Sequence, residues 1–129
     1  KHQVEMTTLD DLFCKPPYVI KKSKILLWLD CEGGELDALE GATQLLKLVD
    51  MVNVEMTMKP PSVEWPDTRT VHKKLRQAGF LRQYIHTLKG TQYDGIYVRN
   101  HLFKKEYCCC PFSIDEYEKE QKEKNCVGK

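Results

Sequence analysis

The sequence predicts an α/β fold in which a mixed sheet, made of parallel strands plus a C-terminal antiparallel hairpin, is flanked by helices. Apolar strand-like segments alternate with segments of helical periodicity, which is the pattern of βαβ units. The last two strand-like segments are joined by a short Gly-containing connection, which is typical of a hairpin. The 129 residues suffice for one hydrophobic core and are too few for two ordinary domains.

The composition is that of an ordinary globular protein, with 41% apolar and 30% charged residues. The formal net charge of +1 gives no electrostatic reason to expect binding to nucleic acid or to an anionic membrane surface. No apolar run approaches the roughly 20 residues of a membrane span, and the first residues do not resemble a signal peptide. We expect a soluble chain of unassigned compartment. Because it opens without Met on sequence that looks internal to a domain, we also expect an excerpt of a longer protein.

Six cysteines are present, and we expect them to be free thiols. Adjacent cysteines bridge each other poorly, and the chain has neither a CxxC pair nor a His pair at zinc spacing. Disulfides and an adventitious soft-metal site are the alternatives. The cysteines are Cys14, Cys31, Cys108, Cys109, Cys110 and Cys126.

The first predicted element is a short helical turn that begins after Thr8, whose side chain can cap it. Pro16 and Pro17 end this turn. The lysines at positions 21, 22 and 24 then form a solvated connection into the next strand. A phosphate site made by these lysines is the alternative.

The segment 25–49 organises the rest of the chain. Five consecutive apolar residues, 25–29, predict a central strand covered on both faces. Acidic and Gly residues at positions 30–34 predict a tight turn. From position 35 to 49 the period becomes helical, with one apolar stripe made by Leu36, Leu39, Leu45, Leu46 and Val49.

Acidic side chains follow or end two neighbouring predicted strands. Asp30 and Glu32 come directly after the first strand, and Glu55 lies near the carboxyl end of the second, residues 51–56. Since a helix between two apolar strands makes those strands parallel, both carboxyl ends lie at one edge of the sheet. Open α/β sheets bind their ligands at this edge. We therefore expect these three carboxylates to converge.

Three carboxylates at one sheet edge suit three kinds of chemistry: they can bind a divalent cation, orient a polar substrate or supply a general base. The alternative is that each acid caps a backbone segment or forms a local ion pair. Two acids directly after a buried apolar strand are hard to explain by packing, so we favour a functional role.

Residues 59–67 contain three prolines and Trp65, which predicts a loop that leaves the same sheet edge as the carboxylates. Trp65 is either part of a substrate lid or a hydrophobic anchor for the loop. Asp67 or Thr68 can cap the helix that follows, and Gly79 can end it. His72 lies beside the buried stripe of this helix, so we expect an exposed and non-catalytic histidine.

Residues 80–88 and 93–98 are the predicted hairpin strands. Beyond position 103 the apolar pattern fails. Residues 113–129 are rich in charge with almost no apolar stripe, which predicts a frayed helix or a flexible tail. The predicted organisation is therefore a domain at 1–103 and a Cys-containing, charged tail at 104–129.

Four segments together resemble the FkbM methyltransferase family, and the resemblance covers about residues 4–103. The segment after the first strand is the most specific of them. The four are TLDDLF at 8–13, LDCEGGELDALEGA at 29–42, VNVEM at 52–56 and LRQAGF at 75–80. The resemblance implies a Rossmann-like class I fold with strand order 3-2-1-4-5-7-6, of which this chain holds strands four to seven. It also implies methyl transfer from S-adenosylmethionine, often to hydroxyl groups of sugars or other small molecules.

The resemblance also implies roles for individual residues. Asp30 and Glu32 would lie beside the transferred methyl group and the acceptor hydroxyl, with Glu55 across the pocket. Asp30, Cys31 and Gly33 would contact the cofactor. Cys31 fills a position that is usually small and aliphatic, so we expect a buried packing residue rather than a nucleophile.

The chain lacks a G-x-G-x-x-G turn, and the family's main cofactor contacts precede the part that is matched. We therefore expect the acceptor-side half of an O-methyltransferase domain, inactive alone and active within a longer protein, with any divalent metal requirement left open. The alternative is a non-catalytic α/β module that binds a partner or cation through its carboxylate edge.

In such a half-domain the strand at 25–29 lacks a neighbour on one side. We expect a homodimer through that edge, an aggregate, or an edge covered by a rearranged terminus.

Overall fold

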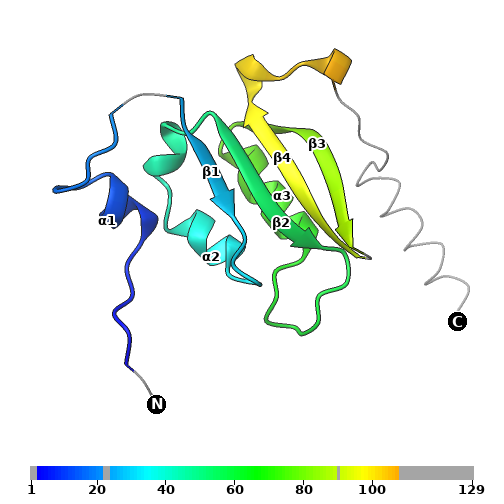
Figure 1. The fold of residues 1–129 in the computed structure, drawn as a ribbon, viewed down its shortest axis with the longest axis horizontal. Coiled ribbons are helices and arrows are strands. Elements are labelled where there is room, and N and C mark those ends of the chain that lie inside the picture. The colour runs from blue at the N-terminus through cyan, green and yellow to red at the C-terminus, as the bar shows by residue number, and fades with distance from the viewer. Residues whose placement is uncertain (1–2, 22–23, 90, 108–129) are drawn as a thin grey trace, which may run out of the picture.

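The computed structural model describes residues 3–21, 24–89 and 91–107, which form a mixed sheet packed against helices (Figure 1). The sheet has the order β1-β2-β4-β3. Strands β1 (Leu26–Leu29) and β2 (Met51–Thr57) are parallel. Strand β4 (Gln92–Arg99) is antiparallel to both β2 and β3 (Phe80–Lys89). The βαβ unit, the C-terminal hairpin and the order 4-5-7-6 implied by the resemblance are thus confirmed.

The position of β1 corrects one prediction. In the described sheet β1 lies at the edge, and only one of its faces is covered. Leu29 is buried, whereas Leu26 and Trp28 are 52% and 63% exposed. These two side chains lie on the face that they share with Met51 and Asn53, away from the helical core. The apolar run indicated a strand correctly, but it did not indicate what covers the second face.

The predicted single helix at 35–49 is wrong, because the segment breaks in its middle. Helix α2 (Glu35–Glu40) ends at Gly41, and a 3₁₀ turn, η1 (Leu45–Lys47), follows. The short helix α1 (Leu9–Phe13) packs against this break, where a Cβ atom on Gly41 would lie only 3.2 Å from the Thr8 Cβ.

Asp10 of α1 stabilises the backbone at the break between α2 and η1. Its carboxylate accepts hydrogen bonds from the Gln44 N–H at 2.9 Å and the Leu45 N–H at 2.8 Å, while its own N–H donates to the Gly41 carbonyl at 2.9 Å. These backbone donors would otherwise lack partners at the start of a helical turn. A carboxylate from elsewhere in the chain therefore redirects the helix.

The caps predicted for the other helices are confirmed. Thr8 caps α1 by accepting from the Asp11 N–H at 3.0 Å. Asp67 caps α3 (Thr68–Gln77) by accepting from the Thr70 N–H at 2.8 Å, and Gly79 follows its end with φ +89°. The buried Thr68 hydroxyl donates to the Thr57 carbonyl at 2.9 Å, which fixes the start of α3 to the end of β2.

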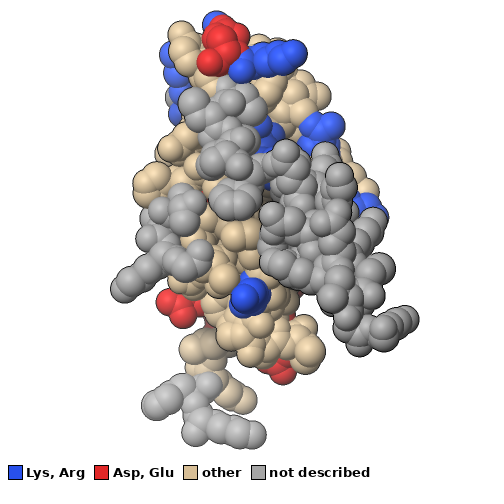
Figure 2. All heavy atoms as spheres, turned by 90° about the vertical axis from the view of Figure 1, so that its right-hand side faces the viewer, with Lys and Arg blue, Asp and Glu red and all other residues tan. Residues whose placement is uncertain are grey.

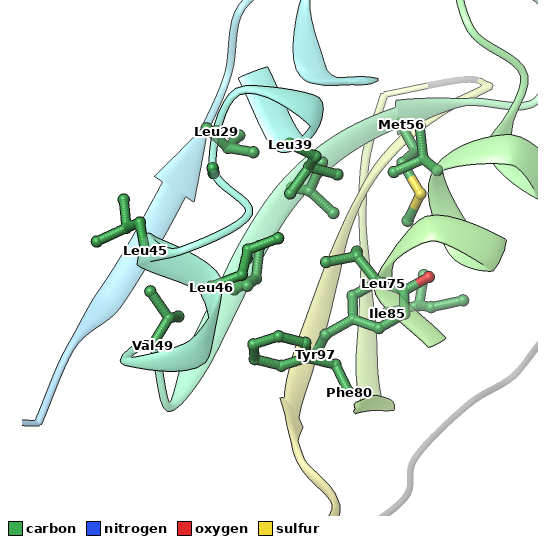
Figure 3. Close-up of a cluster of buried hydrophobic side chains, with 14 of the residues drawn as sticks. Leu29, Leu39, Leu45, Leu46, Val49, Met56, Leu75, Phe80, Ile85 and Tyr97 are labelled. Atoms are coloured by element: carbon green, nitrogen blue, oxygen red, sulfur yellow. The ribbon is translucent and has the colours of Figure 1, made fainter. Parts of the chain in front are cut away.

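The core lies between the sheet and the helical layer (Figure 3). The predicted stripe is fully buried except for Leu36, which is partly buried. Alternate residues of β2 point into this core, while Glu55 points to the other face. The buried cluster consists of Leu29, Leu39, Ala42, Leu45, Leu46, Val49, Val52, Val54, Met56, Val71, Leu75, Phe80, Ile85, Tyr93 and Tyr97.

Arg99 ties the layers together at the end of the sheet away from the carboxyl ends of β1 and β2. Its Nε donates to the Val49 carbonyl and its Nη1 to the Ala78 carbonyl, both at 2.8 Å. Its guanidinium carbon lies 4.3 Å from the centre of the Phe80 ring. The chain continues through η2 (Asn100–Leu102) and η3 (Lys105–Tyr107). The predicted tail beyond residue 107 lies outside the described residues.

Figure 2 shows the side of the molecule at the right of Figure 1, where the basic side chains of the described residues lie scattered and acidic side chains lie beside them at the top. Of the helices in the described ranges, none has the length and apolar character needed to cross a bilayer.

We expect Asp10→Ala to lower the free energy of unfolding by about 1–2 kcal/mol, because it removes the acceptor for two backbone donors. Urea denaturation followed by circular dichroism measures this change. Asp11→Ala, the exposed neighbour on the same helix, is the matched control and should cost less than about 0.5 kcal/mol. Equal losses in the two variants would contradict the role given to Asp10.

Candidate functional site

A tight turn follows β1 at the sheet edge where the sequence predicts a site. The Gly34 N–H donates to the Cys31 carbonyl at 3.2 Å, and the two central residues, Glu32 and Gly33, have φ of +48° and +103°. Positive φ at both central positions is the geometry of a type I′ turn. Gly33 adopts it freely, whereas Glu32 does so only because its surroundings hold it there.

The buried carboxylate of Glu35 holds this turn. Glu35 is 3% exposed, and its two oxygens accept from the Cys31 N–H at 2.9 Å and the Gly33 N–H at 3.0 Å. Both bonds are charge-assisted, and they satisfy backbone donors that the strand and the helix leave unpaired. The first residue of α2 thus reaches back to fix the path of the chain that leaves β1.

The turn brings Asp30 next to Glu55. Burial raises the pKa of the Glu55 carboxyl group above its usual range, and a hydrogen bond with Asp30 together with the charge on Asp30 raises it further. The charges on Asp94 and Glu35 act in the same direction. A carboxyl group with a raised pKa next to a second carboxylate is a common arrangement in catalytic sites.

These acids belong to a row that crosses the sheet on the face away from the core. Glu55 of β2 lies opposite Asp94 of β4, and Asp94 lies opposite His86 of β3. Asp30 follows β1 directly, one position beyond the pair formed by Leu29 and Val54. Like charges directly opposite each other in an antiparallel pair are unfavourable, so packing does not explain this row.

Glu32 does not join the row. Its side chain is exposed at the tip of the turn, and it is not among the charges that raise the pKa of Glu55. The structure therefore brings together two of the three predicted carboxylates, Asp30 and Glu55, and leaves Glu32 outside.

Trp65 of the loop at 59–67 closes over the turn. A Cβ atom on Gly33 would lie 3.0 Å from the Trp65 ring, so the indole rests on the glycine backbone. Figure 1 shows this loop leaving the same end of the sheet as the turn after β1. Beside it is a small pocket whose walls include Glu35, Glu55, Trp65 and Gln92. The contact fits the anchor that the sequence offered as one alternative.

The three residues assigned to the cofactor do not form a cradle for it. The backbone N–H groups of Cys31 and Gly33 already donate to Glu35, and Trp65 covers Gly33. Of the side chains of these three residues, the Asp30 carboxylate and the Cys31 thiol are left to contact a ligand. The turn as described thus does not fit S-adenosylmethionine by itself.

Two predictions about single residues need correction. Cys31 is exposed rather than packed in the interior, because the turn carries it out of the core. Partial burial and the charge on Glu35 raise the pKa of its thiol, which disfavours a thiolate nucleophile. His72 is half-buried rather than exposed, and its Nδ1 lies 2.9 Å from the Tyr97 hydroxyl oxygen.

Sequence reasoning missed Asp94 and His86 as members of the row, and it missed the role of Glu35 in the turn. An antiparallel hairpin was predicted, but its register against β2 was not. That register is what places Asp94 opposite Glu55. Glu35 is visible in the sequence as an acid at the start of the helical segment, but its hydrogen bonds to the turn depend on a geometry that the local pattern does not show.

In the described ranges, no group of three or more His, Cys, Asp and Glu side chains has the arrangement to hold a metal ion. Asp30 and Glu55 form a carboxylate pair, and Asp94 extends it across the sheet.

A mixed sheet flanked by helices, with carboxylates at the carboxyl ends of two parallel strands, places the chain in the α/β class that includes class I methyltransferases. The family model described as the Methyltransferase FkbM domain matches residues 1–82. The chain therefore belongs to the FkbM methyltransferase family. Methyltransferases generally use S-adenosylmethionine as the methyl donor. Neither the curated proteins nor the solved structures gave a match to this chain.

We expect Glu35→Gln to destabilise the chain by about 1–3 kcal/mol, because the amide NH₂ would face a backbone N–H and leave a buried donor unsatisfied. Thermal unfolding measures this loss. Glu40→Gln, an exposed site on the same helix, is the matched control and should stay within about 0.5 kcal/mol of the unmodified chain. If both variants had the stability of the unmodified chain, the turn would not depend on Glu35.

Proposed function

We propose that this chain is the acceptor-side part of a methyltransferase domain that transfers a methyl group from S-adenosylmethionine to a hydroxyl group of a sugar or another small molecule. Family membership supports methyl transfer as the activity. The observation that carries the acceptor-side assignment is the contact between Asp30 and Glu55, which raises the pKa of Glu55.

An alcohol acceptor must lose its proton as the new bond forms, and a positioned carboxylate can take it. A raised pKa makes Glu55 a stronger base than an ordinary glutamate, while Asp30 can orient the hydroxyl through a hydrogen bond. Trp65 and Glu55 line the same pocket, which pairs an apolar surface with a carboxylate. An indole face beside a carboxylate suits a small polar acceptor, which would enter only when the loop at 59–67 moves, because the pocket as described has room for about one water molecule.

The donor has to be held mainly by groups other than Cys31 and Gly33, since the N–H groups of these residues are occupied by Glu35. This agrees with a chain that supplies the acceptor side and little of the donor side. The role of the described residues in the proposal is therefore to bind and deprotonate the acceptor.

In a protein that combines this chain with a donor-binding part, we expect Asp30→Asn and Glu55→Gln each to lower kcat by about 10²- to 10⁴-fold, the usual contribution of general acid–base catalysis. The rate is measured as the transfer of a tritiated methyl group from S-adenosylmethionine to each of a panel of mono- and oligosaccharides. Asp37→Asn, an exposed site on α2, is the control and should leave the rate unchanged.

The pH profile separates a catalytic carboxylate from a structural one. The base must be ionised, so the rate should rise with pH through the pKa of Glu55. The negative charge of Asp30 raises the pKa of Glu55, and Asp30→Asn removes that charge. In the pH–rate profile of this variant, the rise in rate on the acidic side should therefore occur at lower pH. Full activity in both amide variants would rule out a catalytic role for these two carboxylates. If the unmodified protein bound a partner or a cation at this edge and transferred no methyl group, the non-catalytic module would be favoured instead.

A further inference from the structure

A groove lies between η1 and the C-terminal end of α3, within the helical layer. Its volume of about 340 Å³ is that of a cavity that holds a small molecule. Both walls belong to segments that the chain itself supplies, and none of the residues that line the groove is acidic. These residues are Thr43, Leu46, Lys47, Lys74, Gln77 and Ala78.

Two lysines line this groove from different segments, Lys47 from η1 and Lys74 from α3. The Lys47 Nζ donates to the Gln44 Oε1 at 3.0 Å, which leaves two of its three hydrogens for other acceptors. Lys74 is half-buried. Over the ranges that the structure describes, neither lysine has a carboxylate partner. Two ammonium groups that line one groove repel each other unless an anion lies between them.

Arg99 adds a third positive charge behind the wall of this groove. Its Nη1 donates to the carbonyl of Ala78, a residue of the groove, and its Nε donates to the Val49 carbonyl, both at 2.8 Å. The remaining nitrogen, Nη2, is buried and has no hydrogen-bond partner among the described residues. The charge of Asp50 acts on Arg99, but the Asp50 carboxylate accepts from the Ile25 N–H at 3.0 Å. A buried cation with an unused donor is stabilised by an anion nearby.

The C-terminal end of a helix normally repels anions, because its free carbonyls carry partial negative charge. At α3 this repulsion is reduced, since Arg99 binds the Ala78 carbonyl and both Lys74 and Arg76 lie in the last turn. The whole helix, TRTVHKKLRQ, carries four Lys or Arg residues and no acidic one. The electrostatic potential around the groove is therefore positive.

We propose that this groove binds a small molecule that carries a phosphate group. The phosphate lies between Lys47 and Lys74, and the uncharged part of the molecule covers Leu46 and Ala78. A phosphate monoester carries a charge of about −1.5 to −2 at pH 7, which matches two ammonium groups better than a single carboxylate does. The concave shape and the volume favour a small molecule over the surface of another protein.

The groove is a second site, separate from the carboxylate pair. It lies at the C-terminal end of α3, whereas the N-terminal end of this helix follows the loop at 59–67. A ligand in the groove would therefore not compete with an acceptor at Asp30 and Glu55. The proposal does not depend on the proposed methyl transfer.

A titration of the nitrogen-15-labelled chain, followed by nuclear magnetic resonance at constant ionic strength, tests the proposal. Adenosine monophosphate should shift the backbone amide signals of the groove residues until they saturate. Inorganic phosphate should bind more weakly, because it leaves Leu46 and Ala78 uncovered. Adenosine, which lacks the phosphate, should give no saturable shift.

Lys47→Gln and Lys74→Gln should each weaken the binding of adenosine monophosphate by about tenfold, because each removes one charge-assisted contact to the phosphate. Lys74→Arg keeps the charge and should retain most of the affinity. Lys73→Gln, the same change at the exposed neighbouring position on α3, is the matched control and should leave the affinity unchanged. Circular dichroism confirms that each variant is folded.

Shifts that do not saturate, or that spread over all of the basic surface, would overturn the proposal, because nonspecific screening would explain them. An equal loss of affinity in Lys73→Gln and Lys74→Gln would also overturn it. Inorganic phosphate that binds as tightly as adenosine monophosphate would contradict the role given to Leu46 and Ala78. Binding of a hexaglutamate peptide in preference to adenosine monophosphate would make the groove a site for an acidic protein segment instead.

Discussion

The geometry of the site depends on the buried carboxylate of Glu35. Its two oxygens accept the backbone N–H groups of Cys31 and Gly33, so the chain leaves β1 through a turn with positive φ at Glu32. Without these acceptors the turn would carry two unpaired donors and a strained residue. The fixed turn directs Asp30 toward Glu55, and it presents the backbone of Gly33 to the indole of Trp65.

A second carboxylate also accepts backbone N–H groups within the βαβ unit. Asp10 accepts the backbone N–H groups of Gln44 and Leu45 where the chain leaves α2, just as Glu35 accepts those of the turn where the chain enters it. Both carboxylates satisfy donors at points where regular structure is interrupted. The Glu35 carboxylate is buried, whereas the Asp10 carboxylate is supplied by α1, a separate helix. The path between β1 and β2 is therefore set by two acidic side chains as much as by its apolar stripe.

The sequence predicts those features that rest on local pattern, namely the parallel pair, the hairpin, the caps at Thr8 and Asp67 and the helix end at Gly79. Prediction from the sequence fails where a contact between residues far apart in the chain determines the local structure. The break at Gly41 depends on the approach of α1, and the position of Asp94 depends on a strand register that no local pattern encodes. Asp30 and Glu55 were predicted to meet because parallel strands share an edge. The exclusion of Glu32 follows from a turn geometry that the two glycines alone did not specify.

The ionisation of Glu55 tests most directly whether the turn brings two carboxyl groups together. Carbon-13 NMR of the Glu55 side-chain carboxyl, followed as a function of pH, measures it in the chain as it stands. We expect a pKa above the usual glutamate range that falls when Asp30 is replaced by Asn, because the neighbouring charge and hydrogen bond are then removed. An ordinary pKa that does not respond to Asp30→Asn would contradict the carboxylate pair and with it the proposed base.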